Sequence, residues 1–230
     1  MMLSMKRIVQ AGLISIVLGG ANVAVAQGVD PLAPAPTPES KAVDASGPSQ
    51  LIESSANTLL KGIDSRRDEF RKDPTGLYEL VGKTLLPHFD TPYAAQLVLG
   101  KHWRTATVDQ RKRFVEAFYQ SLLYTYGDAM IDFSADRLKV FPTNVAPTDE
   151  RATVRSEIKR SNGTKVPVNY SLRKVNGEWK AWDVVIEGIS YVKSYREDYG
   201  AQVDQQGMDA VIKQLEGRAQ NAKAGKVKKT

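Results

Sequence analysis

Cysteine is absent from this chain of 230 residues, and histidine occurs only twice. Disulfide bonds, thiolate metal clusters and cysteine nucleophiles are therefore excluded. His88 and His102 do not stand at the spacing of a serine hydrolase or of a metal site. The chain also lacks a phosphate-binding loop, a dinucleotide fingerprint and a calcium loop. These absences leave little for catalysis, and we expect no enzyme, no metal ion and no cofactor.

Long apolar runs are scarce as well, and the one present lies near the N-terminus. Lys6 and Arg7 precede the run Ile8–Val25, and Ala24-Val25-Ala26 has the small-residue pattern of a cleavage site. A membrane anchor is the alternative, but polar and small residues interrupt the run and make it a poor span. We therefore expect residues 1–26 to be a secretory signal peptide, which directs the mature protein to the periplasm of a two-membrane bacterium.

Large apolar residues are also rare in residues 27–48, which are rich in proline and alanine, and we expect a flexible linker there. The folded domain is expected to span residues 49–217, followed by a basic disordered tail at residues 218–230. The net charge of +6 is modest, and no basic stripe interleaved with aromatic residues is visible. The sequence therefore does not indicate nucleic-acid binding.

The domain contains a change of hydrophobic period. Between residues 50 and 127, apolar residues recur every three or four positions, which is typical of amphipathic helices. Asp90 and Thr107 are expected to cap two of these helices, Thr107 in a capping box with Gln110. From residue 137 onward, apolar and polar residues alternate, and two Asn-Gly pairs predict hairpin turns between the strands. Helices are expected again after residue 190.

The last strand of this alternating region, Trp179–Glu187, is predicted to divide its side chains between two faces. One face carries Trp182, Val184 and Ile186, and the other carries Ala181, Asp183, Val185 and Glu187. Gly188 is expected to bend the chain sharply into a helix that Ser190 caps. Asp183 and Glu187 would lie about 13 Å apart along the strand, too far for shared acid–base chemistry. Glu187 is instead expected to fix the strand-to-helix junction.

These periods predict an α+β fold in which helices pack on one face of a roughly four-stranded antiparallel sheet. A curved sheet covered in this way is cone-like and readily encloses an internal apolar cavity. The same aromatic and branched residues would also fill an ordinary core, and composition does not separate the two alternatives. A cone-fold enzyme on a small apolar substrate would need an inward acid–base pair, such as Asp183 beside a tyrosine. A ligand-free periplasmic adaptor would have a filled core.

Two motifs carry a resemblance to a known family. Residues Leu99–Phe118 read L-G-K-H-W-R-T-A-T-x-x-Q-R-x-x-F-x-x-A-F, and W-x-A-W-D-V-V-x-E-G-I-S begins at Trp179. Over about residues 50–217 the chain resembles the MlaC family, also called the toluene-tolerance auxiliary family. The resemblance implies a periplasmic phospholipid carrier, not an enzyme, which holds the acyl chains of its cargo in an apolar cavity.

The resemblance also implies partners. Such a carrier shuttles phospholipid between an outer-membrane lipoprotein–porin complex and an inner-membrane ABC transporter complex with an MCE-type substrate-binding subunit, and so maintains outer-membrane lipid asymmetry. The phospholipid is cargo and not a cofactor. Within this fold, the face assignments predict that acyl chains contact Phe114, Phe118, Leu122, Tyr126, Val168, Tyr170, Trp182, Val184, Ile186, Tyr191, Val192 and Tyr195.

Overall fold

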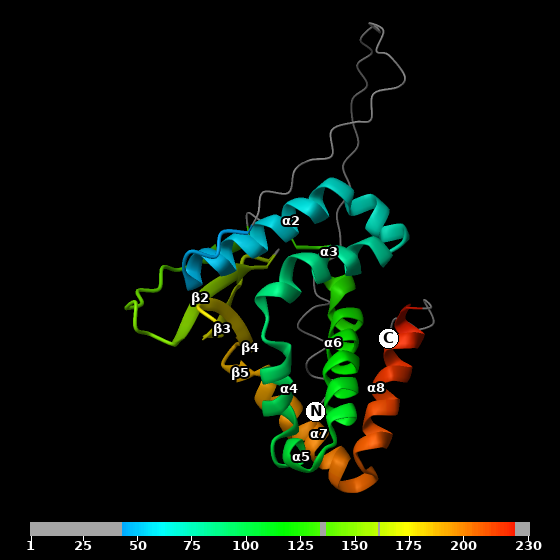
Figure 1. Ribbon diagram of the computed structural model, residues 1–230. Helices are drawn as coiled ribbons and strands as arrows, with labels where there is room; N and C mark the ends of the chain where they lie inside the picture. Colours follow the sequence, from blue (N-terminus) through cyan, green and yellow to red (C-terminus); the bar gives the residue numbers. More distant parts are fainter. Residues whose placement is uncertain (1–42, 134–136, 161, 224–230) are drawn as a thin grey trace, which may run out of the picture. The chain divides into compact units, whose positions relative to one another are not determined.

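The computed structural model describes residues 43–133, 137–160 and 162–223 (Figure 1). The expected signal peptide and most of the expected linker lie outside these residues. The helices are α2 (Pro48–Lys72), α3 (Thr75–Leu85), the 3₁₀ turn η1 (Leu86–His88), α4 (Thr91–Leu99), α5 (Lys101–Thr105), α6 (Val108–Met130), α7 (Tyr191–Gln206) and α8 (Met208–Lys223). The strands are β1 (Leu138–Val140), β2 (Arg151–Lys159), β3 (Lys165–Val175), β4 (Glu178–Ile186) and β5 (Ile189–Ser190). The predicted α+β class is confirmed.

Three predicted helix starts are confirmed by their capping hydrogen bonds. The side chains of Asp90, Thr107 and Ser190 each accept a hydrogen bond of 3.1 Å from the backbone N–H three positions later. Gln110 completes the capping box by accepting from the backbone N–H of Thr107 at 3.0 Å. These caps satisfy N–H groups that have no partner within the helix, and they set where α4, α6 and α7 begin.

The sheet is antiparallel throughout, in the order β1-β2-β3-β4-β5, and it has five strands instead of roughly four. Asn176 and Gly177 both have positive φ, as a two-residue hairpin turn between β3 and β4 requires. Glu187 and Gly188 likewise have φ values of 51° and 82°. They therefore form a second tight hairpin turn, and Ile189 pairs with Ile186 before α7 starts. The expected simple bend at Gly188 is corrected to this turn.

A β-bulge interrupts the alternation of β4. Ser171 of β3 lies opposite Asp183, but the next residue, Leu172, lies opposite Ala181, so that Trp182 is the extra residue. Ala181 consequently points to the buried side with Leu172 and is only 5% exposed. The prediction that Ala181 shares a face with Asp183 is wrong, because alternation holds only while the register is unbroken.

The junction between β4 and α7 is fixed by Asp183 and not by Glu187. The Asp183 carboxylate accepts hydrogen bonds from the Ser190 hydroxyl at 2.6 Å and from the Val192 backbone N–H at 3.0 Å. Asp183 is 4% exposed, whereas Glu187 lies in the exposed turn, 3.9 Å from Arg160. A carboxylate at the first turn of a helix is also favoured by the helix dipole.

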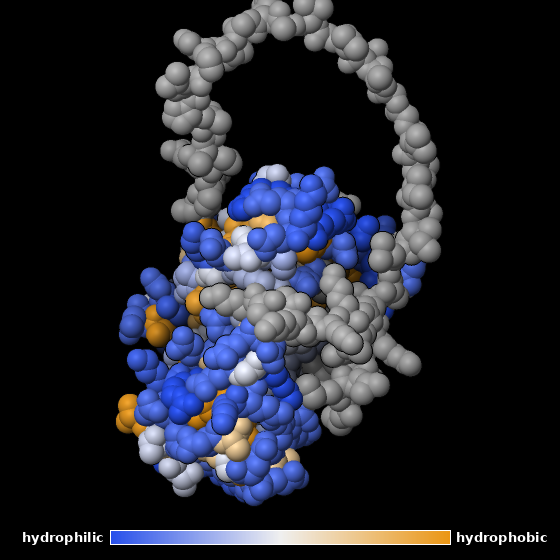
Figure 2. All heavy atoms as spheres, turned by 90° about the vertical axis from the view of Figure 1, so that its right-hand side faces the viewer, coloured by the Kyte–Doolittle hydropathy of each residue, from blue (hydrophilic) through white to orange (hydrophobic). Residues whose placement is uncertain are grey.

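The buried apolar residues form three clusters. The helical cluster lies between α4, α6, α7 and α8; a second cluster joins α2, α3 and the end of α6; and the sheet cluster lies between the sheet and the start of α2. Figure 1 shows the corresponding arrangement: α6 (green) begins near the turn between α7 and α8 (orange) and ends beside α2 and α3 (cyan). On the face seen in Figure 2 the surface is mainly hydrophilic, with apolar groups scattered over it.

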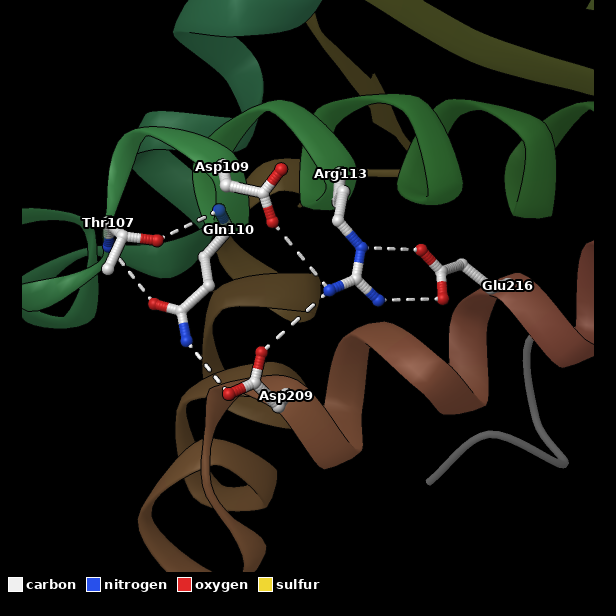
Figure 3. A network of polar contacts seen from close by, with 6 residues as sticks. All are labelled: Thr107, Asp109, Gln110, Arg113, Asp209 and Glu216. Carbon is white, nitrogen blue, oxygen red and sulfur yellow. Dashed lines mark hydrogen bonds and ion pairs between the residues drawn. The ribbon is translucent and has the colours of Figure 1, made fainter.

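The last helix extends further than the sequence suggested. α8 continues to Lys223, so residues 218–223 are helical, and the expected boundary after Gly217 is corrected. Arg113 of α6 holds this helix through a bidentate pair with Glu216, with both N···O distances 2.9 Å (Figure 3). Gln110 donates a further hydrogen bond of 3.0 Å to Asp209 (Figure 3). These contacts align α8 along α6.

Candidate functional site

Aromatic rings from α6 and α7 pack into a continuous row, which we call the aromatic ladder. It consists of Phe114 and Phe118 of α6 with Tyr195 and Tyr199 of α7. The Phe118 ring meets Tyr195 edge-on at 5.3 Å between centroids, and Phe114 and Phe118 both meet Tyr199 edge-on at 5.8 Å. These are preferred aromatic geometries, and Phe114, Phe118 and Tyr199 are at most 6% exposed. Phe114, Phe118 and Tyr199 are therefore packed core, and Tyr195 is the half-buried end of the ladder.

Tyrosines continue the row beyond the ladder, where burial is incomplete. The Tyr126 and Tyr195 hydroxyls are 2.9 Å apart, and the Tyr191 ring lies 6.1 Å from the Tyr126 ring. Burial raises the pKa of Tyr195, and the neighbouring Tyr126 raises it further. Burial likewise raises the pKa of Tyr191. Both phenols stay neutral at ordinary pH, so this end of the row presents aromatic surface with a few hydrogen-bonding groups.

The sheet contributes a second set of predicted residues, which the strand register brings together. Val168 lies directly opposite Ile186, and Tyr170 directly opposite Val184. Directly paired residues of an antiparallel sheet point to the same face. Val168 is 3% exposed, while the other three are half-buried. The Tyr170 hydroxyl lies deep beside Ser156, and burial raises the pKa of this tyrosine.

The structure thus divides the twelve predicted residues into two groups. Those buried in the core are Phe114, Phe118, Val168 and Val192. Those half-buried are Leu122, Tyr126, Tyr170, Trp182, Val184, Ile186, Tyr191 and Tyr195. In the second group, the Trp182 ring meets the Tyr93 ring of α4 edge-on, with 5.6 Å between the ring centroids. Tyr195 already belongs to the ladder.

The remaining six half-buried residues form what we call the seam. Its members come from four elements: Leu122 and Tyr126 from α6, Tyr191 from α7, Val184 and Ile186 from β4, and Tyr170 from β3. The β5 turn connects the β4 and α7 members, because Ile189 pairs with Ile186 two residues before Tyr191. Leu122 packs against the helical cluster and Tyr170 against the sheet cluster, so the seam residues lie at the borders of separate apolar clusters.

One residue of the aromatic row, Tyr199, is not among the twelve predicted acyl-chain contacts. Tyr199 contacts Phe114, Phe118 and Tyr195. Its signal was present, since Tyr191, Tyr195 and Tyr199 recur every fourth residue and therefore share one face of a helix. Burial raises the pKa of Tyr199 to about 12.

In the part of the chain that the structure describes, no three His, Asp or Glu side chains gather as a metal site would require. Both carboxylate oxygens of Asp183 accept hydrogen bonds, one from the Ser190 hydroxyl and one from the Val192 backbone N–H. His102 Nε2, near the start of α5, lies 3.4 Å from an Asp204 carboxylate oxygen. None of the helices described is both long and apolar enough to traverse a bilayer.

Two surface depressions of about 410 and 470 Å³ lie on α4, α5, the start of α6 and α7. They share Trp103 in their walls, and none of the twelve predicted residues lines them. They are therefore separate from the seam.

Comparisons with known proteins agree with the resemblance seen in the motifs. The toluene tolerance protein ttg2D of Pseudomonas putida is 28% identical over 168 residues, covering 73% of this chain and 78% of that protein. The intermembrane phospholipid transport system binding protein MlaC of Haemophilus influenzae is 25% identical over 181 residues. The match covers 77% of this chain and 85% of that protein.

A solved structure has the same fold. It is a phospholipid-binding protein from Ralstonia solanacearum in complex with a phospholipid, with a TM-score of 0.66 and 22% identity, covering 74% of this chain and 96% of that one. The family model described as MlaC protein matches residues 53–217, which include the helices and strands from most of α2 to most of α8. This chain belongs to the MlaC family.

Proposed function

We propose that this protein is a phospholipid carrier that holds acyl chains against the seam. The split apolar core is the observation that carries the proposal. Aromatic and branched side chains of α6, α7, β3 and β4 stay half-buried at the borders of the apolar clusters, and such side chains are the lining expected of a site for an apolar ligand. The name of the Haemophilus influenzae relative, a binding protein of an intermembrane phospholipid transport system, and the phospholipid bound to the structural neighbour support it.

The energetics of lipid transfer explain why such a seam is useful. Burying roughly 30 methylene groups of two acyl chains stabilises the complex by about 24 kcal/mol in gross terms, at about 0.8 kcal/mol per methylene. A bare phospholipid crossing water would lack this stabilisation, whereas a carrier keeps the chains dry. The polar headgroup can remain in solvent, so the site needs no buried charge.

The wider setting of the proposal is the periplasm. Residues 1–26 would be removed as a signal peptide, and the protein would carry lipid between an outer-membrane lipoprotein–porin complex and an inner-membrane ABC transporter complex with its MCE-type subunit. This traffic would maintain outer-membrane lipid asymmetry. No catalytic step is needed, because the cargo leaves chemically unchanged.

The proposal is tested by asking what the purified protein carries. We expect native mass spectrometry of protein isolated from cells to show adducts of phospholipid mass, and solvent extraction to release intact phospholipid. Protein stripped of lipid should reload from phospholipid vesicles. A protein that carries no phospholipid and loads none from vesicles would be a ligand-free adaptor, and the carrier function would be refuted.

A further inference from the structure

The surface around Trp103 has features that lipid binding at the seam does not use. Trp103 separates two depressions, and side chains from four helices line them. The smaller depression is bordered by Pro92, Trp103, Arg111, Lys112, Val115 and Glu116. The larger includes Leu97, Lys101, Arg104 and Arg196. We call these two depressions together the Trp103 surface.

Arg111, which lines the smaller depression, is held in place by contacts with α5. Its Nε donates to the Trp103 carbonyl at 2.8 Å, and a terminal nitrogen donates to the Arg104 carbonyl at 3.3 Å. Its guanidinium carbon also lies 5.2 Å from the centre of the Trp103 ring, a cation–π contact. A fixed guanidinium beside an indole loses little entropy when it binds a partner.

The charge of the Trp103 surface is mainly positive. Lys101, Arg104, Arg111, Lys112 and Arg196 line the depressions, and Glu116 is the carboxylate among the lining residues described. Asp204 balances part of this charge, because it pairs with Lys101 at 2.9 Å. The remaining excess of cations favours a partner that presents carboxylates.

Apolar groups accompany these charges on one stripe of α6. Val108, Arg111, Lys112 and Val115 recur at three- and four-residue steps, so their side chains share a face of the helix. Val108 is 81% exposed, which is unusual for a large apolar residue. An apolar patch rimmed by cations combines the two elements that protein interfaces use, an apolar centre and a charged rim.

We propose that the Trp103 surface docks a partner protein which inserts an apolar side chain bordered by carboxylates. Tryptophan and arginine are the residues enriched at the centres of protein interfaces. A concave surface with the indole in its wall fits a protruding side chain, whereas a membrane surface is bound by side chains that project. The inference rests on the proposed function, since a carrier must dock on the complexes that load and unload it. No seam residue lines these two depressions.

The test reverses charge on the rim without touching the packed core. The variant Arg104→Glu/Lys112→Glu changes two exposed side chains of the Trp103 surface. Its matched control, Lys139→Glu/Arg155→Glu, makes the same charge change at two exposed positions on the sheet. A second variant, Val108→Ser, removes exposed apolar surface and leaves the charge unchanged.

Each variant is measured by biolayer interferometry against the two membrane complexes of the proposed pathway, purified in detergent, with bound phospholipid quantified in parallel. For at least one complex we expect Arg104→Glu/Lys112→Glu to weaken binding by about tenfold or more, mainly in the association rate. Val108→Ser should weaken it about threefold by loss of apolar contact. The sheet control should bind like wild type, and every variant should carry the wild-type amount of phospholipid.

Other outcomes overturn the docking proposal while leaving the carrier function to be judged separately. Unchanged binding of the rim variant, or an equal loss in the sheet control, would show that the Trp103 surface is not the dock. Wild-type protein is also tested on vesicles of phosphatidylcholine with phosphatidylglycerol. Rim-dependent binding to these vesicles instead of the complexes would make a membrane the occupant. If wild type binds neither complex, the docking proposal falls, and its phospholipid content still decides whether it is a carrier.

Discussion

The aromatic ladder and the seam are built from the same kinds of residue, and they lie next to each other on α6, yet their burial differs. Phe114 and Phe118 contact rings of α7 and are enclosed by α4 and α8. One turn and two turns further along α6, Leu122 and Tyr126 remain half-buried. Residue type alone therefore does not distinguish an enclosed core position from a half-buried one. What decides is whether another helix covers the position.

Truncating the ladder should have the largest effect on stability. Phe114→Ala removes a fully buried ring and should lower the free energy of unfolding by about 3–5 kcal/mol, because the cavity left behind cannot collapse completely. Leu122→Ala, in the seam on the same helix, should cost less than about 2 kcal/mol. Urea unfolding followed by circular dichroism measures both. Equal costs for the two variants would show that ladder and seam do not differ in packing.

Alkaline pH should weaken the ladder next most strongly. Tyr199 has its folded-state pKa raised to about 12 by burial, while an unfolded tyrosine ionises near 10. Its contribution to stability is therefore fully present below pH 10 and is lost as the pH rises from about 10 to 12, by about 2–3 kcal/mol. Unfolding at a series of pH values checks this. Tyr199→Phe, which cannot ionise, should show a shallower loss over the same range, and an identical loss would contradict the assignment.

Removing the Asp183 carboxylate, which joins β4 to α7, should lower stability by an intermediate amount. Asp183→Ala removes the acceptor of the hydrogen bonds from the Ser190 hydroxyl and the Val192 N–H at the start of α7. The helix α7 carries residues of both the ladder and the seam. Leaving the Val192 N–H buried without a partner should cost about 1–3 kcal/mol. Asp183→Asn keeps one acceptor oxygen and should cost less. Thermal unfolding distinguishes the two variants, and a larger loss for Asn than for Ala would rule out this role.

Whether a feature of the fold could be predicted from the sequence depends on how far apart in the chain its interacting residues lie. The caps at Asp90, Thr107 and Ser190 were predictable, because each depends on a hydrogen bond spanning three residues. The bulge at Trp182 was not, because it depends on how β3 pairs with β4. β5 was hidden as well, since a strand of two residues is too short to show alternation.

The difference in burial between ladder and seam could not be predicted from the sequence either. Phe118 and Leu122 occupy the same apolar stripe of α6, and only the course of α7 and α8 in space decides which one is enclosed. The family was recognisable because two motifs at distant positions agreed, which does not require knowing the packing around either. Residue-level assignment of a binding surface does require it, and this is why the twelve predicted residues fell into two groups.

Placing a charge in the seam should have the smallest effect on stability and the largest on cargo. Val184 is half-buried and lies opposite Tyr170, so Val184→Arg should change the free energy of unfolding by no more than about 1 kcal/mol, as the long side chain can reach water. Acyl chains would then have to pack against a desolvated guanidinium, and phospholipid loading from vesicles should fall by about tenfold or more. Thr153→Arg is the matched control, because Thr153 is exposed and lies opposite Ser171 on the other face of the sheet. Full loading of a folded Val184→Arg protein would mean that the seam is only an incompletely packed core, and the contrast with the ladder would lose its functional meaning.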